Sequence, residues 1–172
     1  MNLLEKENKI CKITYEEIED NERKIGKGSG FFCKIDNFPI KYALFTNNHI
    51  LKEKDIEKGK LINIEYNNEE KVIEIDEKRR VYTNKELDYT CIEIYESDGI
   101  KDYFKIDPIL FENKNSIENK EIFILQYPEG NELCFSYGKI KLIKDNDIIH
   151  NVSTKEGSSF HQLLKDLIKI IL

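Results

Sequence analysis

The sequence predicts an all-β fold, and three observations support this prediction. Several short runs alternate apolar and polar residues with a period of two, as expected for half-buried strands. Turn-forming residues such as Asn, Asp, Gly and Pro separate these runs. No strong helical pattern interrupts them between residues 10 and 95. Short strands at this spacing are typical of a β-sandwich or a β-barrel.

The expected strands follow from these runs in chain order. They are residues 10–15, 31–35, 42–45, 60–66, 71–76, 81–82, 88–95, 121–127, 133–143 and 147–152. Asn67-Asn68 predicts a hairpin turn, and Gly138 predicts a bulge inside its strand. The charged segment Glu16 to Lys24 predicts a surface loop, and the irregular stretch 97–117 predicts a boundary between two halves.

Composition and charge narrow the possible partners. The chain has 27 Lys and Arg against 33 Asp and Glu, a net charge of −6, and these charges are interspersed without a basic face. We therefore expect no nucleic-acid partner. Charges within the first twelve residues argue against a secretory signal, and no segment approaches the roughly 20 apolar residues of a membrane span. These features predict a cytoplasmic protein without a membrane partner, and they leave its oligomeric state open.

The four cysteines, Cys11, Cys33, Cys91 and Cys134, include no CxxC pair. In a reducing compartment we expect them to remain free thiols, and we interpret all four as small apolar residues of the core. Neither these cysteines nor the three histidines have the spacing of metal ligands. The sequence therefore predicts no metal site and no cofactor.

Three residues suggest a catalytic site when they are taken together. His49 follows the apolar run 42–45, Asp88 stands at the head of the expected strand 88–95, and Ser159 lies in a Gly-Ser turn. A lone histidine after a strand is most often a polar loop residue. His, then Asp, then Ser is, however, one chain order of a catalytic triad, in which the histidine activates the serine and the acid orients the histidine.

Five segments together resemble the trypsin-like serine peptidases of the chymotrypsin fold, the PA clan. They are GKGSGFF, LFTNNHIL, LDYTCIEI, ILQYPEGNELCFSYGKI and HNVSTKEGSS, within residues 10–159. Their order and separations carry the resemblance, since 39 residues separate His49 from Asp88 and 71 separate Asp88 from Ser159. Within the family, the segments are most similar to the intracellular or bacterial branch related to glutamyl endopeptidases.

The resemblance implies a double β-barrel with the active site between its halves. Residues 10–96 would form a complete N-terminal barrel, 97–117 the connection, and 118–159 part of a C-terminal barrel. It also places a possible substrate pocket at His150 and Thr154, although a strand-end histidine without a function is the simpler interpretation of His150.

The resemblance further implies a role for each residue of the candidate triad. His49 would be the general base, Asp88 its orienting acid, and Ser159 the nucleophile that attacks a peptide or protein substrate. The backbone N–H groups of Gly157 and Ser159 would form the oxyanion hole.

The chain departs from the family pattern directly after Ser159. The family has a glycine there, whereas this chain has the bulky Phe160. Residues 160–172 carry apolar positions at three- and four-residue spacing, which predicts a short, atypical helix. This tail either covers the open edge of an incomplete barrel or is a replacement end from a shifted reading frame or misjoined exon. We favour the second explanation, so that the chain is interpreted as truncated just after the catalytic serine.

The primary function hypothesis is a trypsin-like serine endopeptidase that hydrolyses peptide bonds through an acyl-enzyme, with the departure at Phe160 putting its activity in question. The alternative is a catalytically inactive pseudoprotease that binds peptides or a protein partner. A cysteine peptidase of the same fold is a third option, which Ser159 at the nucleophile position argues against.

Overall fold

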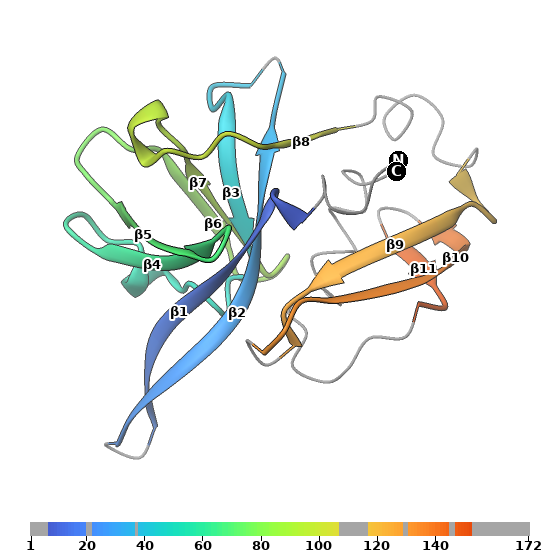
Figure 1. Ribbon diagram of the computed structural model, residues 1–172, viewed down its shortest axis with the longest axis horizontal. Coiled ribbons are helices and arrows are strands. Elements are labelled where there is room, and N and C mark those ends of the chain that lie inside the picture. Colours follow the sequence, from blue (N-terminus) through green and yellow to red (C-terminus); the bar gives the residue numbers. More distant parts are fainter. Residues whose placement is uncertain are drawn as a thin grey trace.

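The structure, a computed structural model, describes residues 7–19, 22–36, 38–106, 117–128, 131–144 and 147–152. Strands dominate these ranges, which confirms the all-β prediction (Figure 1). The strands are β1 (Ile10–Glu19), β2 (Glu22–Lys34), β3 (Tyr42–Thr46), β4 (Leu61–Tyr66), β5 (Glu69–Glu74), β6 (Val81–Asn84), β7 (Tyr89–Glu93), β8 (Phe104–Lys105), β9 (Glu121–Gln126), β10 (Cys134–Lys144) and β11 (Asp147–His150). Two 3-10 turns, η1 (Glu53–Asp55) and η2 (Glu96–Asp98), complete the elements.

The first eight strands form one curled sheet. Their order is β5-β4-β1-β2-β3-β7-β6, and β8 pairs with β2 off this path. The pairings along the path are antiparallel, and the short β8 runs parallel to β2. Phe32, Leu44 and Ile92 lie fully buried within the curl, as alternation along three neighbouring strands requires. The sheet therefore folds around its own apolar core, as a barrel does (Figure 1).

The predicted hairpin around Asn67-Asn68 is confirmed. Strands β4 and β5 pair from Leu61 opposite Glu74 to Tyr66 opposite Glu69. Asn67 and Asn68 have φ angles of 52° and 61°. Two consecutive left-handed residues are what a two-residue hairpin loop of type I′ needs, and asparagine tolerates this backbone better than most residues.

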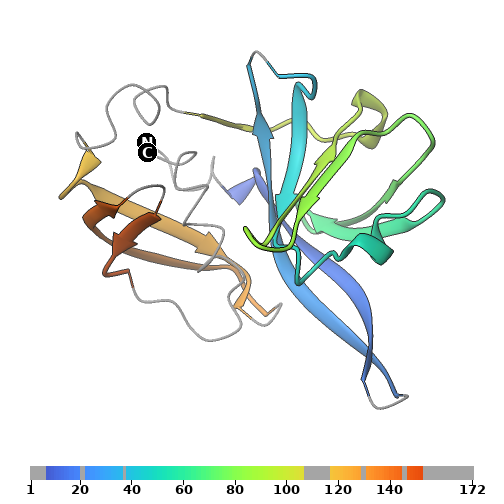
Figure 2. The ribbon, with the colours of Figure 1, turned by 180° about the vertical axis from the view of Figure 1, so that it is seen from behind.

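The prediction of a surface loop from Glu16 to Lys24 is wrong. Strand β1 continues to Glu19, β2 begins at Glu22, and the two strands remain paired to their ends. The pairing of β1 with β4 ends at Thr14, and beyond it the hairpin extends past the sheet as a two-stranded ribbon (Figures 1 and 2). Residues 16–24 are mostly charged, so their sequence lacks the alternation that marks a half-buried strand.

A separate sheet of order β11-β10-β9 follows, and its three strands were all predicted. The expected bulge at Gly138 is not there, because Gly138 pairs regularly with Ile122. The register shifts instead between Ile140 and Leu142, on the side of β10 that faces β11. Gly138 has another reason to be glycine, since a Cβ atom there would lie 2.9 Å from the backbone nitrogen of Val152.

The two sheets share an apolar core. Its buried members from the first sheet include Ile10, Phe31 and Phe104, and those from the second include Ile124 and Ile140. Phe31 stacks on Phe45 at a centroid distance of 5.5 Å and meets Phe104 edge-on at 6.4 Å. The second sheet therefore packs against the outer face of the curled first sheet, opposite the core that the first sheet encloses.

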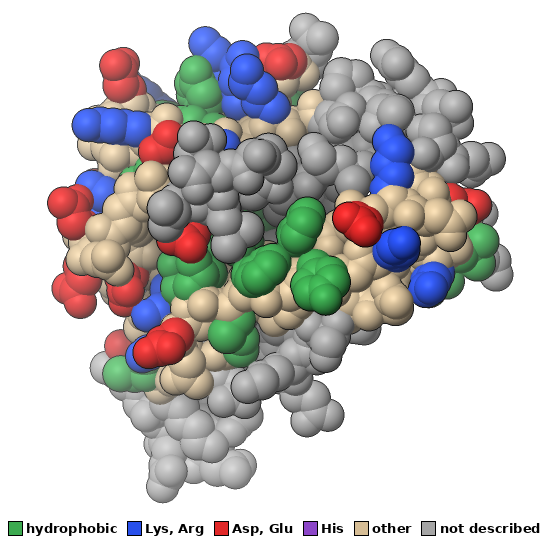
Figure 3. Space-filling model, turned by 45° about the vertical axis from the view of Figure 1, so that its right-hand side comes forward, with side chains coloured by type: hydrophobic (Ala, Val, Ile, Leu, Met, Phe, Trp, Pro, Cys, Tyr) green, Lys and Arg blue, Asp and Glu red, His purple; other side chains and the backbone are tan. Residues whose placement is uncertain are grey.

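The outer face of the second sheet carries a row of aromatic side chains. The ring of Phe135 lies 5.9 Å from that of Phe123 and 6.5 Å from that of Tyr137, and all three side chains are substantially exposed. Figure 3 shows the hydrophobic side chains gathered on this side of the molecule.

Three of the four cysteines lie in the core as predicted. Cys11, Cys33 and Cys91 are buried, and burial raises the pKa values of the Cys33 and Cys91 thiols to about 12. Cys134, at the start of β10, is only half-buried, so its prediction as a core residue is wrong. In the part of the chain that the structure describes, no helix is long and apolar enough to cross a membrane.

Candidate active site

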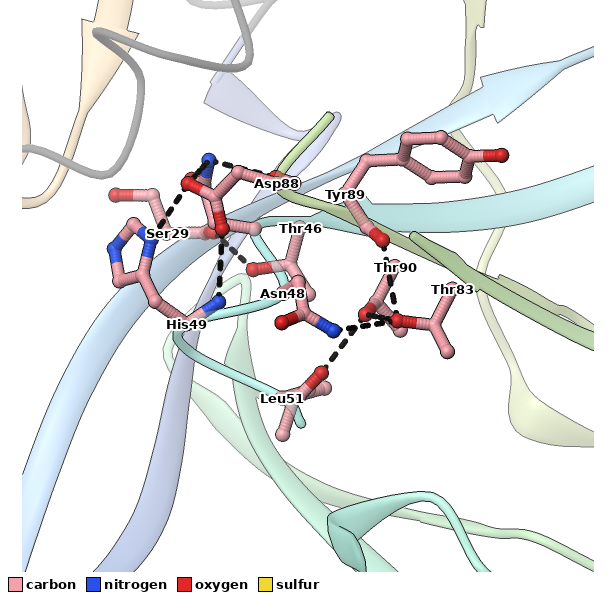
Figure 4. A network of polar contacts seen from close by, with 10 residues as sticks. Ser29, Thr46, Asn48, His49, Leu51, Thr83, Asp88, Tyr89 and Thr90 are labelled. Carbon is pink, nitrogen blue, oxygen red and sulfur yellow. Dashed lines mark hydrogen bonds and ion pairs between the residues drawn. The ribbon is translucent and has the colours of Figure 1, made fainter. Parts of the chain in front are cut away.

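Strand pairing brings the first two residues of the predicted triad together. Strand β3 ends at Thr46, and Thr46 pairs with Thr90 at the start of the antiparallel β7. The loop that leaves β3 and the turn that enters β7 therefore lie at the same edge of the sheet. His49 lies on the first of these segments and Asp88 on the second, so residues 39 positions apart come into contact (Figure 4).

Asp88 holds His49 through two hydrogen bonds. Its Oδ2 atom lies 2.7 Å from His49 Nδ1, and its Oδ1 atom accepts the backbone N–H of His49 at 2.9 Å. The Asp88 side chain is only 13% exposed, whereas that of His49 is 53% exposed. An ionised carboxylate can only accept, so this contact places a proton on Nδ1 and leaves Nε2 with a lone pair that can take up a proton.

Asn47 is a further member of the site, whereas the sequence predicted for Asn47 or Asn48 only the capping of a helical turn after His49. Its side chain is fully buried, and Nδ2 donates to the backbone oxygen of Asp88 at 3.1 Å and to Asp88 Oδ2 at 3.0 Å. The same carboxylate oxygen thus accepts from Asn47 and contacts His49. Asn47 therefore positions the acid, which in turn orients the imidazole.

The backbone of Asp88 adopts a left-handed conformation, with φ at 48°. Asp88 closes a tight turn, in which its N–H donates to the Lys85 oxygen at 3.3 Å and the Leu87 N–H donates to Asn84 Oδ1 at 2.8 Å. Aspartate is among the few residues enriched in this conformation. The turn lets the chain enter β7 while the carboxylate faces His49.

Hydroxyl groups fasten the His49 loop to the strands around it (Figure 4). Thr90 Oγ1 donates to the Leu51 oxygen at 2.8 Å, and Asn48 Nδ2 donates to Thr83 Oγ1 at 2.7 Å. Thr90 is fully buried, so its bond to Leu51 is shielded from water. The loop that carries His49 is therefore fixed on both sides of the histidine.

Ser29 connects this site to the second sheet. It is fully buried on β2, and its backbone oxygen accepts from Thr46 Oγ1 at 2.9 Å. Its own Oγ accepts the backbone N–H of Tyr127, the residue after β9, also at 2.9 Å. One serine thereby joins the strand that leads to His49 with the end of a strand 98 residues later in the chain.

A hollow of about 580 Å³ opens beside the His49–Asp88 pair. Its lining residues come from the two segments that carry the pair: Asn48, His49, Lys52, Glu53, Lys54, Lys85 and Asp88. The exposed side of the imidazole therefore meets a space large enough for side chains of a bound molecule.

The other predicted site residues have different outcomes. Ser159, Gly157 and Thr154 lie outside the described residues, as does the tail 160–172. His150 lies at the end of β11, where its Nδ1 accepts the backbone N–H of Val152 at 3.2 Å. Its place in a substrate pocket stays a prediction. No group of three or more His, Cys, Asp or Glu side chains within the described ranges could hold a metal ion.

Comparisons with known proteins agree with this fold. No family model and no curated protein sequence matches the chain. Among solved structures, the chain is similar to the Rv3671c protease in its inactive form, with a TM-score of 0.56 and 11% identity over 91% of this chain and 72% of that one. It is also similar to the HtrA-type protease AlgW with a decapeptide, with a TM-score of 0.58 and 12% identity over 96% of this chain and 56% of that one.

A third similar structure is Deg5, with a TM-score of 0.57 and 12% identity over 91% of this chain and 73% of that one. At such identities the likeness concerns the fold. Together with the strand order and the two sheets, it assigns this chain to the all-β, chymotrypsin-like fold of those proteases.

Proposed function

We propose that this chain is a trypsin-like serine endopeptidase, in which His49 is the general base, Asp88 orients it and Ser159 is the nucleophile. The observation that carries the proposal is the contact of 2.7 Å between His49 Nδ1 and Asp88 Oδ2, next to an open hollow. The fold shared with solved proteases supports it. The five sequence motifs favour the branch related to glutamyl endopeptidases.

The proposed chemistry follows from the protonation of the imidazole. His49 Nε2 takes the proton of the Ser159 hydroxyl as the oxygen attacks the carbonyl carbon of a peptide bond. Asp88 stabilises the imidazolium that forms, and the N–H groups of Gly157 and Ser159 bind the oxyanion. The proton then passes to the leaving amine, the acyl-enzyme remains, and water releases the acid by the same steps in reverse order.

A second candidate is a pseudoprotease that binds peptides without cleaving them. The observation that favours it is Phe160, which stands where the family has glycine beside the nucleophile. A side chain there disfavours the positive φ angles that a glycine adopts freely, and the oxyanion hole depends on that backbone. The two candidates differ in whether Ser159 is activated.

A fluorophosphonate probe tests the proposal, because it forms a covalent bond only with an activated serine. We expect the purified chain to be labelled at Ser159, which peptide mass spectrometry locates. Asp88→Asn leaves the geometry in place but removes the correct imidazole tautomer, and we expect it to slow labelling by about 10⁴-fold. Ser159→Ala abolishes labelling.

Phe160→Gly separates the two candidates. The unmodified chain could remain unlabelled while Phe160→Gly is labelled. The His49–Asp88 pair would then be able to activate Ser159, and Phe160 would block the site, which supports the pseudoprotease. If neither protein is labelled although circular dichroism shows that both contain β-sheet, the peptidase proposal is overturned.

A further inference from the structure

The outer face of the second sheet is built from cross-strand pairs on β9 and β10. Five exposed side chains form it, and we call them the β9–β10 face: Glu121, Phe123, Phe135, Tyr137 and Lys139. Tyr137 of β10 lies opposite Phe123 of β9, and Lys139 lies opposite Glu121. Aromatic side chains on this face are therefore followed, further along the same two strands, by a cation beside an anion.

The aromatic side chains of this face are strongly exposed. Phe135 is 46% exposed and Tyr137 is 72% exposed, although both lie on β10, the central strand of this sheet. Leu142 and Ile149 are exposed on the same sheet, whereas the exposed large hydrophobic side chains of the first sheet and its loops are spread over many elements. Figure 3 shows hydrophobic side chains gathered on one side of the molecule, with acidic and basic side chains next to them. An exposed apolar patch with a polar rim is typical of a surface that binds another protein.

The two charged side chains of the face form no ion pair within the part of the chain that the structure describes. Glu121 and Lys139 are partners in the strand register, yet no described residue lies within ion-pair distance of either. Together with the exposed Lys141, they give this side of the sheet a formal charge of +1, whereas the chain has a net charge of −6. Two copies of an acidic chain repel each other, and this repulsion is weakest where a surface carries both signs without excess negative charge.

The register of β9 against β10 makes the face complementary to itself. A two-fold axis parallel to the strands, midway between β9 and β10, exchanges the positions of these strands between two copies. Each residue then lies opposite its own cross-strand partner in the other copy. Tyr137 would lie over Phe123 of the other copy, and Lys139 would meet Glu121 of the other copy. Each of these contacts would occur twice, between two sheets packed face to face.

We propose that the β9–β10 face binds the same face of a second copy of this chain, in a symmetric dimer. The aromatic side chains form the centre of the contact, and the pairs of Lys139 with Glu121 lie toward its rim. Because β10 has 11 residues and the sheet has three strands, the face measures roughly 35 Å by 14 Å, or about 500 Å². A standard interface buries about 800 Å² per partner, so the dimer is weak, with a Kd of the order of 10 µM.

Sedimentation velocity of the full chain at low salt, from about 1 to 200 µM, tests this proposal. We expect the weight-average mass to rise over this range from that of one chain toward that of two. Tyr137→Thr keeps a residue that is favoured in strands but removes the most exposed ring, and it should raise the Kd at least about tenfold. Tyr82→Thr is the matched control, because it removes a 41% exposed tyrosine from β6 of the first sheet and should leave the Kd unchanged.

Charge reversals test the two-fold arrangement itself. Glu121→Lys places two lysines opposite each other across the contact, and Lys139→Glu places two glutamates there, so each variant alone should stay monomeric. In an equimolar mixture, the lysines of one variant face the glutamates of the other, and we expect dimers to form again. This recovery requires both variants to be folded, and no charge pair within one copy can produce it.

Three results would overturn the proposal. A chain that stays monomeric over the whole concentration range would leave the face to a different occupant. Equal weakening by Tyr137→Thr and Tyr82→Thr would place the contact elsewhere or make it non-specific. A mixture of the two charge variants that stays monomeric would exclude the pairing of Lys139 with Glu121 of the other copy.

Discussion

At the scale of single residues, Asp88 is the centre of the site. Its carboxylate accepts hydrogen bonds from the backbone and the side chain of His49 and from the side chain of Asn47. Its left-handed backbone orients the carboxylate toward His49. Asn47 holds the same carboxylate from the buried side. The orientation of the imidazole therefore depends on two contacts in series, Asn47 to Asp88 and Asp88 to His49. Weakening the first contact should disturb the second.

Replacing Asn47 with alanine tests this dependence. Asn47→Ala removes both hydrogen bonds to Asp88, and a hydrogen bond to a charged group contributes about 1.5–3 kcal/mol. We expect fluorophosphonate labelling to slow by roughly 10- to 100-fold, since about 1.4 kcal/mol corresponds to a factor of ten. The measurement is the second-order labelling rate constant at fixed pH.

Asn48→Ala provides the control for Asn47→Ala. Asn48 has the same chemistry, but its amide donates to Thr83 Oγ1 and not to Asp88. We expect this variant to be destabilised in thermal unfolding while its labelling rate changes less than about threefold. Equal slowing in both variants would mean that Asn47 acts only through general stability.

The sequence indicated His49 and Asp88 as candidates because His49 follows one apolar run and Asp88 stands at the head of another. Their contact depends on the register of β3 against β7, which a single sequence does not determine. Asn47 was not assigned to the site for a related reason. In Thr46-Asn47-Asn48-His49, both amides look alike, and only the fold decides that one faces Asp88 and the other Thr83.

At the scale of elements, the strands with one buried face were the predictable ones. Strands β4, β5, β9 and β10 alternate because one side of each meets a core, and their boundaries agree with the sequence to within two residues. The outer part of the β1–β2 ribbon lacks this alternation in its sequence, and the sequence therefore predicts a loop there. The hairpin turn at Asn67-Asn68 was predictable because its local chemistry is specific.

The turn at Asn68 gives a prediction for stability. Its φ of 61° suits glycine, and a left-handed backbone costs ordinary residues about 1–2 kcal/mol. We expect Asn68→Gly to raise the free energy of unfolding by up to about 1 kcal/mol and Asn68→Val to lower it by about 1–2 kcal/mol. Urea denaturation followed by circular dichroism measures both changes.

Asn63→Val makes the same exchange at an exposed position inside β4. Valine is favoured in an extended strand, so this control should leave stability unchanged or raise it. If valine at positions 63 and 68 had equal effects, the left-handed backbone of Asn68 would not be what limits its replacement.

At the scale of the whole molecule, the two sheets are coupled through their shared core and through Ser29. Phe31 and Phe104 of the first sheet pack in the same cluster as Ile124 and Ile140 of the second. The Tyr127 N–H donates to Ser29 Oγ on β2, and Thr46 Oγ1 at the end of β3 donates to the backbone oxygen of Ser29, so Ser29 joins the second sheet to the strand that leads to the site. A division of the chain into two halves at residues 97–117 stays a prediction. The coupling between the two sheets determines whether they unfold together or separately.

The shared core predicts that the chain unfolds in one cooperative transition. Ile124 is 1% exposed, and removing three of its carbons leaves a cavity that costs about 2–5 kcal/mol. We therefore expect Ile124→Ala to lower the midpoint of the whole transition by about 5–15 °C in differential scanning calorimetry. Ile149→Ala, on the second sheet but 48% exposed, should shift it much less. Two separate transitions, with Ile124→Ala moving only one of them, would mean that the sheet around the His49–Asp88 pair is stable without the second sheet.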